Sequence, residues 1–157
     1  MTVAEATEAY ITHLEPFAGT LLLGAPAITN GLLPGVGPDY LAAFLDACAN
    51  CTVDFVTLHY YGDVLNSTAF TEYVQYIWTR FRKPIWITEF GAEGGSPVQV
   101  QLWLQGVLLW LDAQPFVSRY AYFMDGPSHR DPAGILREGL IAEIGDGMSA
   151  LGVLYDS

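Results

Sequence analysis

Short apolar runs alternate with helix-like segments along the whole chain, and this alternation restricts the possible folds more than any other feature. The runs are rich in β-branched and aromatic residues and predict buried strands over residues 20–30, 53–62, 84–89 and 117–124. Helices are predicted between and around them, over residues 2–16, 38–48, 68–81, 96–113 and 149–155. Strands that alternate with helices are typical of right-handed parallel βαβ units. The sequence therefore predicts an α/β fold with four parallel strands.

Two stretches follow neither pattern. Residues 125–137 are expected to form a loop, and residues 139–147 a short extended turn.

Two helix starts are marked by their residue types. Thr2 is the expected N-cap of the first helix, and Ser96 is the expected N-cap of the helix that begins at Pro97.

Composition limits the class of protein and its partners. The 157 residues are 52% hydrophobic and only 15% charged, so the chain must bury a large core and is one domain or part of a larger one. A net charge of −11 argues against nucleic acid or an anionic membrane as partner, and it allows a neutral polymer such as a glucan. No apolar run reaches the ~18 residues of a membrane span. Residues 1–10 are acidic and do not resemble a signal peptide.

Cys48 and Cys51 are the two cysteines, and their C-x-x-C spacing allows three interpretations. A thioredoxin-like redox pair would follow a strand, whereas here a predicted helix precedes the pair. A zinc site would need two more ligands nearby, and the chain has no second cysteine pair. A local disulfide or a reduced pair is the interpretation that fits best, and the spacing does not choose between these two states.

A buried strand that stops at a carboxylate is the strongest chemical signal in the chain. The apolar run after Pro84 ends at Glu89, and Gly91 gives the backbone the freedom to turn away. In parallel α/β folds, side chains at the carboxyl ends of strands line the active-site mouth. Glu89 is therefore a candidate catalytic group. The alternative is that it caps the strand or pairs with a nearby cation.

Five segments together resemble one known family. The chain resembles glycoside hydrolase family 128, the Asl1-like catalytic domain, whose members are β-1,3-glucanases with a (β/α)8 barrel. The resemblance spans nearly the whole chain in the family's order, and each segment alone is a weak motif. The segments are Ala25–Asn30, Phe44–Phe55, Leu58–Gly62, Lys83–Phe90 and Ala150–Tyr155.

The resemblance implies that Glu89 is the nucleophile and that the general acid/base is absent from this chain. In this family the glutamate that ends the seventh barrel strand is the nucleophile of a retaining hydrolysis, and Glu89 occupies that motif. The general acid/base belongs to an Asn-Glu-Pro motif after the fourth strand, and this chain contains no such motif. Counted back from Glu89, the predicted strands are the fifth to eighth. We therefore expect residues 1–157 to form the C-terminal half of a TIM barrel.

The resemblance also implies a set of sugar-binding residues, and it leaves alternatives open. His59, Tyr61, Tyr122 and Asn30 are the expected substrate contacts, with no metal and no cofactor. A half barrel would expose strand edges, so self-association is expected, and without the acid the isolated chain should be weak or inactive. The alternatives are a non-catalytic β-glucan-binding fragment or a nonfunctional remnant. Family members are usually secreted or in the cell wall, so the localisation of this chain stays open.

Overall fold

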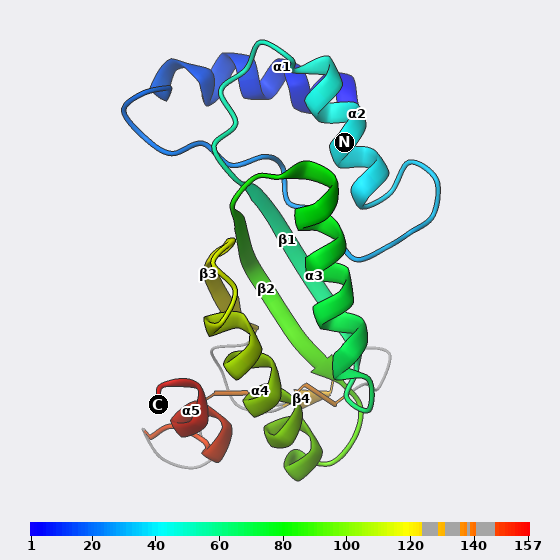
Figure 1. Ribbon diagram of the computed structural model, residues 1–157, viewed down its shortest axis with the longest axis vertical. Coiled ribbons are helices and arrows are strands. Elements are labelled where there is room, and N and C mark those ends of the chain that lie inside the picture. The colour runs from blue at the N-terminus through cyan, green and yellow to red at the C-terminus, as the bar shows by residue number, and fades with distance from the viewer. Residues whose placement is uncertain (124–128, 131–135, 138, 141–146) are drawn as a thin grey trace.

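A three-stranded parallel sheet with two helices against it organises the molecule (Figure 1). Strands β1 (Val56–Asp63), β2 (Ile85–Glu93) and β3 (Val117–Tyr122) lie in the order β1-β2-β3. Helices α3 (Ser67–Phe81) and α4 (Pro97–Asp112) connect them as crossovers. The α/β class and the parallel strands are thereby confirmed. The computed structural model describes residues 1–123, 129–130, 136–137, 139–140 and 147–157.

The remaining elements lie at the two ends of this sheet. Helices α1 (Val3–His13) and α2 (Pro38–Ala47) pack together at the end where β1 begins (Figure 1). The ring of Tyr10 meets that of Phe44 edge-on between them, with 5.3 Å between centroids. Helix α5 (Ala150–Tyr155) packs on α4. The smaller elements are the 3-10 turn η1 (Glu15–Phe17) and the antiparallel pair β4 (His129–Arg130) and β5 (Leu136–Arg137).

Both predicted helix starts are confirmed. Thr2 and Ser96 form capping boxes with Glu5 and Gln99, so each cap satisfies backbone donors that the first turn leaves free. The first helix is shorter than predicted, because it ends at His13 and a 3-10 turn carries the chain through Pro16.

The first predicted strand, over residues 20–30, is wrong as a regular strand. The backbone of this segment runs beside β1 and the residue before it, with isolated parallel bridges at Gly24 with Phe55 and Ile28 with Leu58. The amide of Ala25 donates to the carbonyl of Phe55, the residue before β1, at 2.9 Å, and that of Ile28 donates to Thr57 of β1 at 3.1 Å. The segment advances three residues between these two bonds while its acceptors advance two, so one extra residue interrupts the ladder. The segment thus lies alongside β1 without forming a fourth strand.

Strand β2 is longer than predicted. The prediction ended it at Glu89 with a turn at Gly91, but the strand continues to Glu93. The backbone turns only at Gly94 and Gly95, whose φ angles of 74° and 77° favour glycine. Glu89 therefore lies inside β2 and not at its tip.

A β-bulge at Thr88 changes which side of the sheet the β2 side chains face. Leu58 pairs with Ile87, but the next residue, His59, pairs with Glu89, so Thr88 is the extra residue. Before the bulge Ile87 is buried, and after it the buried ring is Phe90, three residues later rather than two. The bulge therefore turns Phe90 into the core and leaves Glu89 on the opposite face, beside Thr88.

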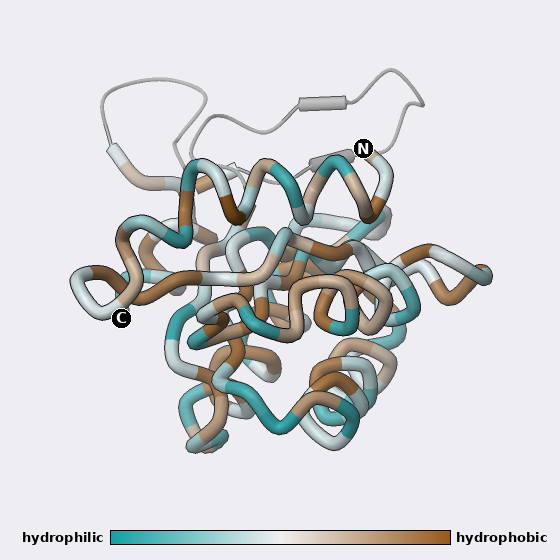
Figure 2. The backbone as a smooth tube through the Cα atoms, turned by 90° about the horizontal axis from the view of Figure 1, so that it is seen from above, coloured by the Kyte–Doolittle hydropathy of each residue, from teal (hydrophilic) through white to brown (hydrophobic). Residues whose placement is uncertain are grey.

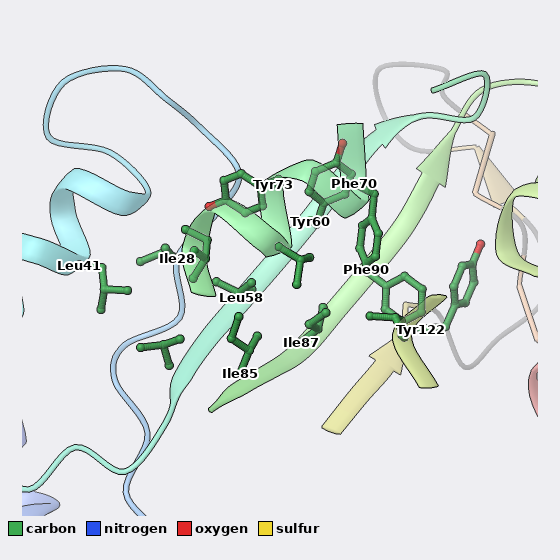
Figure 3. Packing of buried hydrophobic residues seen from close by; sticks show 14 of the residues in the cluster. Ile28, Leu41, Leu58, Tyr60, Phe70, Tyr73, Ile85, Ile87, Phe90 and Tyr122 are labelled. Atoms are coloured by element: carbon green, nitrogen blue, oxygen red, sulfur yellow. The ribbon is translucent and has the colours of Figure 1, made fainter. Parts of the chain in front are cut away.

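The core lies between the sheet and the helices. Phe70 of α3 is fully buried and contacts Tyr60 and Phe90 of the sheet, as Figure 3 shows. Hydrophobic and hydrophilic residues interleave along the helices when the molecule is viewed from above (Figure 2), as expected of helices that bury one face.

The remaining predictions have mixed outcomes. The final helix is confirmed as α5, with Ser149 as its N-cap. The predicted loop over 125–137 is partly wrong, because β4 and β5 lie within it; each is only two residues long, too short for a periodic signal. The rest of that stretch, the end of the fourth predicted strand at Met124 and most of the predicted turn over 139–147 lie outside the described residues.

Candidate active site

Glu89 is held by two side chains from the neighbouring strand β1. The hydroxyl of Tyr61 donates a hydrogen bond to Oε2 at 2.8 Å, and Nδ1 of His59 lies 3.4 Å from the same oxygen. Both contacts are possible because His59 and Tyr61 are two residues apart on β1 and so share a face. The Glu89 side chain keeps 34% of its surface exposed. The carboxylate is thus oriented through Oε2 and remains open to solvent.

The imidazole of His59 joins two residues of the bulge. Its Nε2 lies 3.0 Å from Oγ1 of Thr88, and its Nδ1 faces Glu89. His59 is not a core histidine bonded to backbone, because both contacts are with side chains and its side chain is 29% exposed. Sequence reasoning missed Thr88, because the bulge that places it here leaves no mark in the hydrophobic pattern.

Asn30 supports Tyr61 from the segment beside β1. Its Nδ2 donates to the carbonyl of Tyr61 at 2.9 Å, and its Oδ1 accepts from the Tyr61 amide at 3.4 Å. The Asn30 side chain therefore bonds to the backbone of β1 along the edge where no regular strand pairs with it. Asn30 lies next to the site as predicted, but both ends of its amide hold Tyr61 rather than point to an open sugar position.

Tyr122 is not brought to Glu89. It is 7% exposed and packs at 90° against Phe90, on the face of the sheet that the helices cover (Figure 3). The next residue, Phe123, lies on the Glu89 side. Its ring meets that of Tyr61 at 87° and 5.7 Å and is 40% exposed. The structure therefore places Phe123, and not Tyr122, beside Tyr61, and a sugar contact at Tyr122 stays a prediction.

The cysteine pair lies apart from this group of residues. Cys48 and Cys51 are joined by a disulfide at the end of α2, with 5.1 Å between their Cα atoms. The next residue, Thr52, donates its backbone amide and its hydroxyl to the two carboxylate oxygens of Glu15, at 2.8 and 2.9 Å. These contacts fasten the end of α2 to the segment after α1.

Other features of the described residues do not compete with this site. A cavity of about 600 Å³ lies between α2 and α3, lined by Asp39, Tyr76 and Arg80 among others, and does not include Glu89. No group of three His, Cys, Asp or Glu side chains in the described part of the chain could hold a metal. The helices that the structure describes are all too short or too polar to cross a membrane.

Comparison with known proteins gives a clear family. A family model described as "Glycosyl hydrolase catalytic core" matches residues 1–155. The chain belongs to this family. The chain is also 30% identical to alkali-sensitive linkage protein 1 of Schizosaccharomyces pombe over 98% of its length. The predicted resemblance to glycoside hydrolase family 128 and its Asl1-like members is confirmed.

Solved structures agree in fold. One is a curdlan-specific exo-β-1,3-glucanase of family 128 from Blastomyces gilchristii, with 29% identity and a TM-score of 0.81 over the whole of this chain. Another is an endo-β-1,3-glucanase from Lentinula edodes, with 26% identity and a TM-score of 0.81 over 98% of it. The chain spans 63% of each of these structures and 29% of the Schizosaccharomyces pombe protein.

Proposed function

We propose that this chain supplies the nucleophile of a retaining β-1,3-glucanase, and that the nucleophile is Glu89. The observation that carries the proposal is the pair of contacts on one oxygen. Tyr61 and His59 both hold Oε2, so Oε1 is the oxygen that neither of them engages. A carboxylate fixed through one oxygen presents the other in a defined direction, which favours attack on a bound sugar.

The chemistry follows the two steps of retaining hydrolysis. Oε1 of Glu89 bonds to the anomeric carbon while the bond to the glycosidic oxygen breaks and its electron pair leaves with that oxygen, which takes up a proton. Water then bonds to the same carbon and gives its proton to the group that supplied one in the first step, while the ester bond to Glu89 breaks and the carboxylate is released. The substrate class comes from relatives, since an Amycolatopsis mediterranei β-1,3-glucanase, 26% identical, was solved with laminaritriose.

The proton donor for the first step is not among the described neighbours of Glu89. A retaining enzyme needs its second carboxyl about 5–5.5 Å away. The contacts described for the Glu89 side chain are with a tyrosine and a histidine. Glu93 shares its strand but lies four residues on, which is about 13 Å along an extended backbone. The acid must therefore come from residues other than these.

Structures of a relative support a second catalytic glutamate that lies far from the nucleophile in the sequence. The Amycolatopsis mediterranei enzyme was solved as two different glutamate-to-alanine variants, each with laminari-oligosaccharides. The two altered positions are further apart in that enzyme than Glu89 is from Met1 here. We therefore propose a partial barrel, with residues 1–157 as the half that carries the nucleophile. Self-association through its open face stays a prediction.

An assay with laminarin tests whether the chain lacks a proton donor. We expect the isolated chain to release reducing ends from laminarin at the background rate, because the glycosidic oxygen departs poorly without a proton. The measurement is a reducing-sugar assay at matched concentrations of wild-type chain and Glu89→Gln. Turnover by the wild type that the variant loses would show that the chain has its own proton donor and would overturn the partial-barrel proposal.

A second candidate function is a non-catalytic glucan-binding fragment. The half-exposed ring of Phe123 beside Tyr61 favours it, because an exposed aromatic face can stack on the apolar face of a sugar ring. Laminarin affinity that Phe123→Ala lowers, in a chain that never reacts with an activated sugar, would favour binding alone. A chain with neither affinity nor reactivity would be a nonfunctional remnant.

A further inference from the structure

The bulge in β2 places two side chains opposite one histidine. In a regular parallel ladder, Thr88 and Glu89 would face opposite sides of the sheet. Because Thr88 is the extra residue, both side chains reach the ring of His59. The ring is therefore bound at both nitrogens, by a hydroxyl and by a carboxylate.

These two partners differ in what they can exchange with the ring. An ionised carboxylate only accepts hydrogen bonds, whereas a threonine hydroxyl both donates and accepts. A neutral imidazole carries one N–H and one bare nitrogen. The nitrogen that faces Glu89 at 3.4 Å must carry the hydrogen for that contact to be favourable. Nε2 is then bare, and the hydroxyl of Thr88 at 3.0 Å is the donor to it.

We propose that Thr88 is a positioning residue that acts through His59. Its hydroxyl donates to Nε2 and stabilises the neutral ring in the Nδ1–H tautomer, which turns its hydrogen toward Oε2 of Glu89. Its role in the reaction rests on the proposed function of Glu89, whereas the tautomer itself does not. Second partners of this kind commonly fix the orientation and tautomer of functional histidines.

The arrangement gives the Glu89 oxygen one hydrogen bond and one longer electrostatic contact. Tyr61 donates to Oε2 directly at 2.8 Å, and His59 adds a second, longer contact only in one tautomer. With the other tautomer, a bare Nδ1 would face the carboxylate and repel it. Thr88 thus adds a donor to the tautomer in which His59 supports the position of Glu89.

The test compares Thr88→Val, which keeps the shape and removes the hydroxyl, with Thr88→Ser, which restores a hydroxyl. Because Thr88 is exposed, both variants should fold. The readout is the imidazole ¹⁵N spectrum of the histidine-labelled chain, at a pH where the ring is seen to be neutral and with His59 assigned by its loss in His59→Gln. We expect the Nδ1–H pattern in the wild type and in Thr88→Ser, and a tautomer mixture in Thr88→Val. An Nε2–H pattern in the wild type, or an unchanged pattern in Thr88→Val, would overturn the inference.

A kinetic readout separates this inference from the proposed function. With an activated fluoro-sugar that traps Glu89, Thr88→Val should react about 3- to 10-fold more slowly, the range expected of one hydrogen bond, and Thr88→Ser should react near the wild-type rate. A changed tautomer with an unchanged trapping rate would overturn the positioning role. If the wild-type chain is not trapped at all, the proposed function fails, while the spectrum still decides the tautomer.

Discussion

Replacement of Glu89 by Gln is expected to abolish covalent reaction of the chain with 2-deoxy-2-fluoro-β-laminaribiosyl fluoride. Fluoride leaves without a proton, so this reagent needs the nucleophile and no proton donor. The amide that Glu89→Gln introduces cannot replace the attacking carboxylate, and we expect a loss of roughly 10³-fold or more, since loss of a single nucleophile elsewhere costs up to ~10⁶-fold. Fluoride release by ion-selective electrode and the mass of the intact chain measure the reaction.

Glu93→Gln is the matched control for this experiment. It removes an identical carboxylate from the same strand, four residues further along β2. We expect this variant to release fluoride at the wild-type rate. Equal rates for Glu89→Gln and the wild type, or a loss in Glu93→Gln alone, would move the nucleophile away from Glu89.

Phe70→Ala is expected to lower the free energy of unfolding by about 3–5 kcal/mol. Phe70 is fully buried, and its ring lies 5.0 Å from that of Tyr60 and 5.6 Å from that of Phe90. It also meets Trp103 of α4 at 5.8 Å, so it joins α3, α4 and the sheet. Removal of the ring leaves a cavity that these aromatic neighbours cannot fill. The loss is a large part of the ~5–15 kcal/mol that stabilises a typical domain.

The measurement is urea unfolding followed by tryptophan fluorescence, with Phe17→Ala as the control. Phe17 undergoes the same change of side chain but is 49% exposed, and surface changes of this kind cost about 0.5 kcal/mol or less. The slope with denaturant should stay the same while the midpoint falls. A loss at Phe70 no greater than at Phe17 would contradict the description of the core.

Helix positions could be predicted from the sequence because their signals are local. Ser96, Pro97 and Gln99 mark the start of α4 within four residues, and Thr2 with Glu5 marks α1 in the same way. Strand β1 was predictable from its β-branched and aromatic run. The segment over residues 20–30 has a similar apolar run, but one extra residue between Ala25 and Ile28 breaks its ladder, and the apolar run does not reveal that irregularity.

The side of the sheet that each β2 residue faces could not be predicted, because the bulge at Thr88 depends on how β2 pairs with β1. Alternation from Ile85 and Ile87 alone would bury Glu89 and expose Phe90, and only pairing with β1 reverses this. The burial of Tyr122 was not predictable for the same reason, since the side that it faces depends on pairing with the shifted β2. Glu89, His59 and Tyr61 were predicted together because strand-end polar residues and the family resemblance pointed to the same edge of the sheet.

The most direct test of the central claim is to locate the sugar on the wild-type chain after reaction with the fluoro-laminaribiosyl fluoride. Proteolysis and tandem mass spectrometry would identify the modified residue. We predict a single disaccharide, bound as an ester to Glu89. A disaccharide on any other residue, or a chain that stays unmodified while it binds laminarin, would contradict the account.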